Sequence, residues 1–110
     1  MAETLKVKHE VYRATIPFPR LIDEVELDDA TANSWVCPAG TRVVLISVDN
    51  AVYMRAVSAA VVPTGETTDG TGSLYIPATA VFEVEEGVTY SFIRAAGSGT
   101  ALVTIGRYSS

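Results

Sequence analysis

The sequence predicts an all-β protein: an antiparallel β-sandwich, jelly-roll-like or immunoglobulin-like, with an extended N-terminal segment. Apolar and polar residues alternate with period two along most of the chain, and turn signals recur about every 8–12 residues. No segment of helical length shows a period of 3.6 residues. The 110 residues suit one domain, and the 48% hydrophobic content supplies one core without disulfide or metal staples.

The first alternating segment predicts a strand near the N-terminus. Its two faces are Leu5, Val7, His9, Val11 and Arg13 on one side and Lys6, Lys8, Glu10, Tyr12 and Ala14 on the other. Pro17 and Pro19 end it, because proline cannot donate to a strand ladder. We therefore divide the chain into an N-terminal strand or arm (residues 1–20) and a sandwich body (residues 21–110). Residues 20–27 predict a weak edge strand or an extended loop.

The next part of the chain predicts the centre of the sandwich. Residues 35–37 form a short apolar run that the turn at Pro38-Ala39-Gly40 stops. Residues 41–48 are apolar on both faces, which is typical of a central strand. Asp49-Asn50 is a turn signal, and residues 51–57 alternate again. These two segments are expected to form a hairpin.

The C-terminal half predicts a loop and several more strands. Residues 63–73 are rich in Pro, Gly, Thr and Asp, and a loop of that length often carries function. The remaining expected strands are residues 74–76, 81–85, 88–94 and 101–108. The last two flank Gly97-Ser98-Gly99-Thr100 and are expected to form a second hairpin. The count is seven or eight short strands.

Composition narrows the class of function. The net charge of −5 and the lack of a basic stripe argue against nucleic-acid binding. No run approaches the roughly 20 apolar residues that a membrane span needs, and no signal peptide is evident, so synthesis in the cytoplasm is expected. Cys37 is the single cysteine, which excludes an intrachain disulfide.

The residues that carry chemistry do not form a recognisable catalytic set. His9 and Cys37 are the single histidine and the single cysteine, too few for a zinc site, and no placed base or nucleophile accompanies them. Glu83 and Glu85 are expected on one strand face, roughly 6–7 Å apart, where paired carboxylates can hydrolyse glycosides. A polar strand face produces the same pattern. We expect no catalytic residue, no cofactor and no bound metal.

Two polar segments have competing interpretations. The acidic run Asp23–Asp29 suggests calcium, but it lacks the glycine and spacing of a twelve-residue calcium loop. A solvated acidic face, or an ion-pair partner for the basic first strand of a neighbouring subunit, is favoured. The Asp69–Ser73 segment differs from an aspartic-protease signature because Gly70 follows the aspartate, and it lacks the lysine and helix of a phosphate loop. A tight glycine turn is favoured.

Aromatic residues are the remaining candidates for a binding face. Trp35, Tyr53, Tyr75, Tyr90 and Tyr108 can stack on sugars or on a protein partner. Half-exposed aromatics are also ordinary in strands. We expect most of the five to pack the sandwich with their polar atoms at its rim.

A further pattern lies in the order of turns and strands. It comprises Pro38-Ala39-Gly40-Thr41-Arg42-Val43, a strand ending in Ser47-Val48-Asp49, Val52-Tyr53-Met54-Arg55, Asp69-Gly70-Thr71-Gly72-Ser73, and Gly97-Ser98-Gly99-Thr100. This order resembles small β-sandwich virion proteins of tailed bacteriophages, which decorate or cement capsids or belong to the tail. The resemblance covers roughly residues 35–108. It implies a homo-oligomeric, non-enzymatic protein of the virion that binds other virion proteins, such as a major capsid or tail protein.

We therefore expect a structural protein that self-associates and stabilises a capsid or tail through its sandwich surfaces and N-terminal arm. The interface candidates are Leu5, Val7, Val11, Tyr12, Phe18, Thr67, Asp69 and Tyr75. The alternative is a carbohydrate-binding β-sandwich module.

Overall fold

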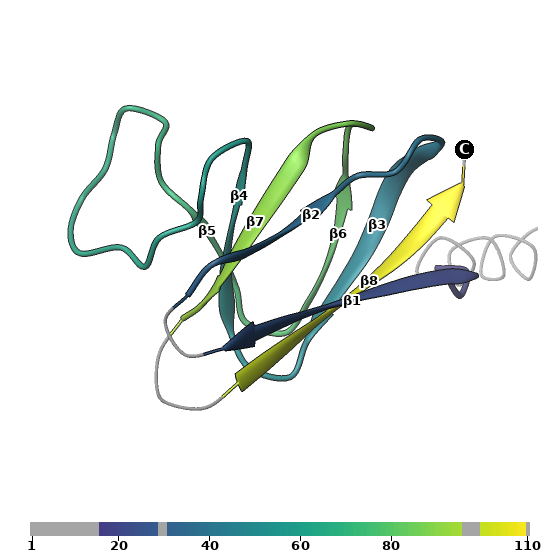
Figure 1. Ribbon diagram of the computed structural model, residues 1–110, viewed down its shortest axis with the longest axis horizontal. Coiled ribbons are helices and arrows are strands. Elements are labelled where there is room, and N and C mark those ends of the chain that lie inside the picture. Colours follow the sequence, from purple (N-terminus) through teal and green to yellow (C-terminus); the bar gives the residue numbers. More distant parts are fainter. Residues whose placement is uncertain (1–15, 29–30, 96–99, 110) are drawn as a thin grey trace, which may run out of the picture.

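The computed structural model describes residues 16–28, 31–95 and 100–109, and its regular structure there consists of eight β-strands (Figure 1). The strands are β1 (Leu21–Asp28), β2 (Asn33–Val36), β3 (Thr41–Val48), β4 (Val52–Ala56), β5 (Leu74–Ile76), β6 (Thr79–Glu83), β7 (Thr89–Arg94) and β8 (Thr100–Ser109). The expected all-β class is confirmed.

The strands form two four-stranded sheets that face each other. Sheet A has the order β1-β8-β3-β6, sheet B has the order β2-β7-β4-β5, and every neighbouring pair is antiparallel. The pairing is nested: β1 pairs with β8, β2 with β7, β3 with β6 and β4 with β5. This is a long hairpin rolled up into a jelly roll. The order differs from the ABED and CFG sheets of an immunoglobulin domain, so the jelly-roll alternative holds.

Both expected hairpins are wrong. The strands expected at residues 41–48 and 51–57 exist as β3 and β4, but β3 lies in sheet A and β4 in sheet B. β7 and β8 are likewise in different sheets, and residues 96–99 between them lie outside the described residues. Turn residues indicate that the chain reverses its direction. They do not indicate whether the next strand pairs with the preceding one or crosses to the opposite sheet.

The weak edge strand expected at residues 20–27 is confirmed as β1, and all eight of its residues pair with β8. Two segment boundaries that bear on function differ from expectation. The connection between β4 and β5 spans residues 57–73, not 63–73. β6 ends at Glu83, so Glu85 lies beyond the strand and the two carboxylates do not share a strand face.

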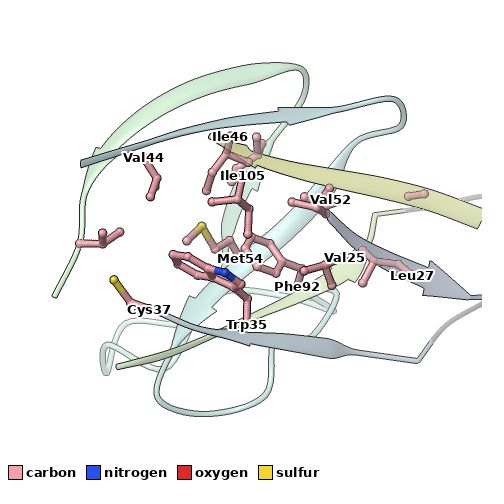
Figure 2. Packing of buried hydrophobic residues seen from close by; sticks show 14 residues of the cluster. Val25, Leu27, Trp35, Cys37, Val44, Ile46, Val52, Met54, Phe92 and Ile105 are labelled. Atoms are coloured by element: carbon pink, nitrogen blue, oxygen red, sulfur yellow. The ribbon is translucent and has the colours of Figure 1, made fainter. Parts of the chain in front are cut away.

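The core lies between the sheets and is built from alternate residues of each strand (Figure 2). β3 contributes Val44 and Ile46, β8 contributes Val103 and Ile105, and Phe92 faces them from β7 of sheet B; all five are fully buried. Each side chain of this size stabilises the fold by about 1.5–3 kcal/mol when it leaves water. Val43 and Leu45, on the opposite side of β3, are half-buried, as a central strand requires.

The described chain begins on the outer face of sheet A. Tyr108 Oη donates a hydrogen bond to the carbonyl of Pro17 (2.6 Å), and Pro19 is buried. A Cβ on Gly106 would lie 2.3 Å from Pro19 Cγ, so only glycine fits beneath the proline. Pro17 and Pro19 therefore contact β8 directly. The strand expected at Leu5–Ala14 lies outside the described residues.

Replacing Gly106 with alanine tests this contact. Gly106→Ala should destabilise the protein by about 1–3 kcal/mol in urea unfolding, because the added methyl overlaps the Pro19 ring. Combining it with Pro19→Gly removes the obstructing atoms and should recover part of the loss relative to the two single changes. Strictly additive effects would contradict the packing of Pro19 on β8.

Candidate interaction surfaces

The interface candidates within the described residues lie at opposite ends of the molecule. Four other candidates lie outside the described residues: Leu5, Val7, Val11 and Tyr12. Phe18 is 82% exposed and lines a hollow of about 520 Å³ with Leu21 and Tyr108, where the chain enters β1. Thr67 and Asp69 are exposed in the 57–73 loop, and Tyr75 lies on β5. Figure 1 shows that loop at one end of the molecule and the start of β1 at the other.

The outer face of sheet A carries an apolar row across all four strands. The register aligns Ile22 of β1, Gly106 of β8, Leu45 of β3 and Val81 of β6, with Pro19 seated on Gly106. Ile22 and Val81 remain 47% and 48% exposed. This row is a continuous apolar strip with water on one side.

Carboxylates flank the apolar row on the same face. Glu24, Glu26 and Asp28 follow Ile22 along β1, and Glu83 follows Val81 along β6. The paired positions of this face include no lysine and no arginine. A partner for the outer face of sheet A therefore needs apolar contacts and positive charge. The acidic run is visible in the sequence, but only the strand register shows that it lies beside an apolar row.

The outer face of sheet B differs because the 57–73 loop covers part of it. The loop is tied to β7 by the Val57 N–H, which donates to the Thr89 carbonyl (2.7 Å), and by the Ala60 N–H, which donates to Ser91 Oγ (2.9 Å). Ala60 and Ser91 are both buried as a result. Beyond this anchor, almost every residue from position 61 to 75 is exposed.

Two tyrosines form a cross-strand pair on the outer face of sheet B. Tyr53 of β4 is aligned with Tyr75 of β5, and their ring centroids are 5.3 Å apart with a tilt of 46°. Tyr75 is about half exposed, so the pair presents aromatic surface to solvent. The other aromatics behave as expected: Trp35 is buried and contacts Tyr90 at a centroid distance of 6.1 Å.

The Asp69–Ser73 segment forms the expected glycine turn. Gly70 has a φ of +86°, and Asp69 Oδ1 accepts hydrogen bonds from the Thr71 hydroxyl (2.6 Å) and the Thr71 N–H (3.1 Å). These two donors, the hydroxyl first, lower the pKa of the Asp69 carboxyl below its ordinary value. Asp69 therefore holds the tip of the loop in shape while it is ionised.

The Asp69 turn predicts a measurable change in titration. Thr71→Val removes the hydroxyl donor and should raise the Asp69 pKa towards its ordinary value, whereas Thr71→Ser should preserve the lowered pKa. In the native chain the ionised Asp69 carboxylate stabilises the turn above the ordinary aspartate pKa, and this stabilisation is lost as the pH falls through the lowered pKa. NMR titration of the carboxyl carbon measures this. Equal pKa values in native and Val variants would contradict the hydroxyl contact.

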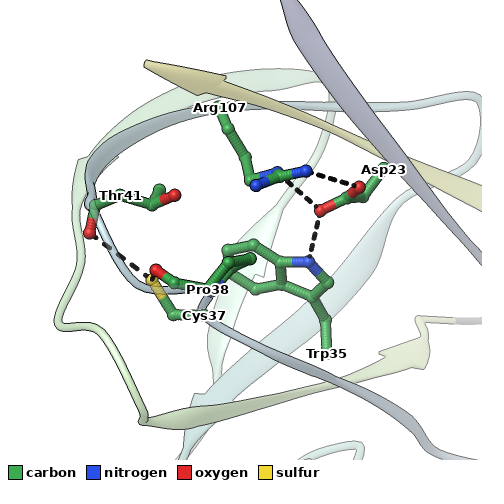
Figure 3. Close-up of polar contacts among 6 residues, drawn as sticks. All are labelled: Asp23, Trp35, Cys37, Pro38, Thr41 and Arg107. Atoms are coloured by element: carbon green, nitrogen blue, oxygen red, sulfur yellow. Dashed lines mark hydrogen bonds and ion pairs between the residues drawn. The ribbon is translucent and has the colours of Figure 1, made fainter. Parts of the chain in front are cut away.

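A polar cluster that sequence reasoning missed closes one end of the sandwich (Figure 3). Asp23 of β1 accepts a hydrogen bond from Trp35 Nε1 of β2 (2.8 Å), which links the two sheets. Arg107 of β8 donates from Nη2 to Asp23 Oδ1 (3.4 Å), and its Nε lies 2.9 Å from Oδ2 without an aligned hydrogen bond. The three residues are far apart in sequence, so no local pattern identifies them.

Removal of Asp23 tests this cluster. Asp23→Ala should cost about 1–3 kcal/mol in chemical unfolding, because it leaves the Trp35 indole N–H and the Arg107 guanidinium without their partly buried acceptor. Asp23→Asn keeps an acceptor for the indole and should cost less. Glu24→Ala, the adjacent exposed residue, is the matched control and should change stability by less than about 0.5 kcal/mol. Equal effects at positions 23 and 24 would contradict the assignment.

Cys37 is buried, as expected for a small apolar residue. Its thiol lies 3.6 Å from the Thr41 carbonyl, and burial, with a smaller effect of Glu86, raises the pKa of the thiol. Within the described ranges, no group of three or more His, Cys, Asp or Glu side chains gathers as a metal site. The same residues include no helix long and apolar enough to cross a membrane.

No protein-family model, curated protein or solved structure matches this chain.

Proposed function

We propose that this protein is a non-enzymatic structural protein of a phage-like virion, which self-associates and stabilises a capsid or tail through its sandwich surfaces and N-terminal arm. The outer face of sheet A is the observation that carries the proposal. Its apolar row crosses four strands, and Ile22 and Val81 are each about half exposed. Contiguous exposed apolar surface of this kind marks a site of protein–protein contact.

An exposed apolar residue lies next to this surface towards the N-terminus. Phe18 is 82% exposed where the chain approaches β1, beside Tyr108. A single exposed apolar residue is ordinary on a protein surface, but Phe18 directly precedes Pro19, which is seated on Gly106 of the apolar row. A specific interface buries roughly 1,200–2,000 Å² in total, which a whole sheet face together with an arm can supply.

The order of turns and the fold support the particle role. The jelly roll occurs in viral capsid proteins and also in lectin domains, so the fold alone does not decide the function. The resemblance to tailed-phage virion proteins favours the first of these. The partners on this proposal are further copies of the chain and a major capsid or tail protein, and the protein resides in the virion.

Sedimentation velocity over a range of protein concentrations tests self-association. We expect the full-length chain to assemble, and Ile22→Glu to weaken assembly by at least about tenfold, because it places a charge in the apolar row. Ser47→Glu is the control, since Ser47 is exposed on the same face but outside that row. Deleting residues 2–15 tests the arm and keeps Pro19 on Gly106.

Two outcomes of this experiment count against the proposal. A chain that stays monomeric at every concentration, alone and when mixed with candidate particle proteins, would contradict the structural role. Assembly that is unchanged by Ile22→Glu would remove the outer face of sheet A from the interface.

The Tyr53–Tyr75 pair favours a second candidate function, carbohydrate binding. The tilted pair, in which Tyr75 is about half exposed and Tyr53 is partly buried, offers on a sheet face the flat apolar surface on which sugars stack. A glycan panel read by thermal stability tests it, because a ligand of the native state raises stability by mass action. A hit that is lost in Tyr75→Ala and kept in Tyr108→Phe would support this function, and a flat panel would remove it.

A further inference from the structure

β6 leaves one edge of sheet A open. On its β3 side, Val48 N–H donates to the Ala78 carbonyl (2.9 Å) and Val84 N–H donates to the Arg42 carbonyl (2.7 Å). In an antiparallel pair, alternate residues of a strand direct their N–H and C=O groups towards the same neighbour. The residues of β6 that direct these groups away from β3 are Thr79, Val81 and Glu83. No strand among the described residues pairs with that side.

The other three edge strands are better protected. Asn33 Nδ2 donates to the Glu26 carbonyl at the edge of β1 (3.1 Å), and β1 carries several carboxylates. β2 has four residues and β5 has three. Short strands and charged side chains are the usual ways in which proteins block addition to an edge. β6 has five residues and a single carboxylate at its end, so it is the most accessible edge.

An apolar hollow lies beside this edge, between the two sheets. It measures about 210 Å³ and is lined by Met54, Arg55, Ala56, Leu74, Phe82, Glu83, Val84 and Tyr90. The hollow opens here because β5 pairs with only the first three residues of β4 and leaves Arg55 and Ala56 without a partner on that side. Since an apolar cavity of ~150 Å³ accommodates benzene, this hollow has room for an aliphatic side chain.

We propose that residues 5–13 of a second copy of the chain add to β6 as a fifth strand of sheet A. This proposal rests on the self-association proposed above and names the site at which the arm binds. The segment alternates, so one side carries Leu5, Val7, His9, Val11 and Arg13, and an aliphatic side chain of this side can enter the hollow. The other side carries Lys6 and Lys8, which suit the outer face beside Glu83.

The position of residue 16 favours a second copy over the same chain. Pro17 lies at Tyr108, which the register aligns with Val43 and then with Glu83, the last residue of β6. An arm running back from there along β6 of its own chain pairs with it in the parallel sense. Every strand pair of the sandwich is antiparallel, and a second copy approaches β6 without this restriction.

Proline substitutions at the open edge test the proposal in the full-length chain. Val81→Pro and Thr79→Pro each remove an N–H that points away from β3, so the existing ladder keeps its hydrogen bonds. We expect either change to raise the dissociation constant for assembly at least tenfold in sedimentation velocity, with no loss of the β-sheet circular dichroism of the monomer. Thr79→Ser keeps the N–H at a position outside the apolar row and is the matched control. Leu5→Asp with Val7→Asp should reproduce the loss from the arm side.

Hydrogen exchange of the Thr79, Val81 and Glu83 amides in the native chain identifies the occupant. We expect slow exchange in the assembled protein and at least tenfold faster exchange after dilution to monomer. Fast exchange in an oligomer that both proline variants still form would overturn the β6 site and leave self-association standing. Slow exchange in a monomer would show that the arm folds back on its own chain. A chain that never assembles would overturn both proposals.

Discussion

The sandwich depends on the burial of one alternating set of side chains between its two sheets. Ladder hydrogen bonds run within each sheet, so Phe92 of sheet B and the valines and isoleucines of sheet A must hold the layers together by packing. Between β1 and β2, two polar contacts supplement this packing: Asp23 with Trp35, and the Asn33 side chain with the Glu26 carbonyl. They fix the relative position of the edge strands where the apolar interior ends.

The same constraint decides which residues face outward. Because the period of a strand is two, burying Val25 and Leu27 necessarily presents Glu24 and Glu26 on the other side of β1. On β3 and β6 the outward set includes Leu45 and Val81, which form the apolar row with Ile22 and Gly106. On sheet B part of the outward set is instead covered by the 57–73 loop, and another part is the Tyr53–Tyr75 pair. The two faces therefore offer different chemistry to a partner, which is why they support different functional proposals.

Local alternation was sufficient to locate most strands and the inward side of β4, but it carried no information about which strands pair. The turn at Asp49-Asn50 fits a hairpin and a crossover between sheets equally well. The crossover follows from the pairing of all eight strands together, which a local pattern does not contain. The Asp23–Trp35–Arg107 cluster depends on that selection and was invisible beforehand. The Asp69 turn, whose contacts span two residues, was predictable because its geometry is local.

The nested order of strands has a consequence for how the chain reaches this structure. The innermost strand pair, β4 with β5, is joined by residues 57–73. Each further pair encloses a longer stretch of sequence, and β1 with β8 encloses the longest. Chain entropy favours closing the shortest loop first, since each doubling of loop length costs about 0.6 kcal/mol more. Closure entropy therefore favours zipping from the inside outward, in which the 57–73 connection closes first and β1 and β8 pair last, as the slow step expected for a non-local β topology.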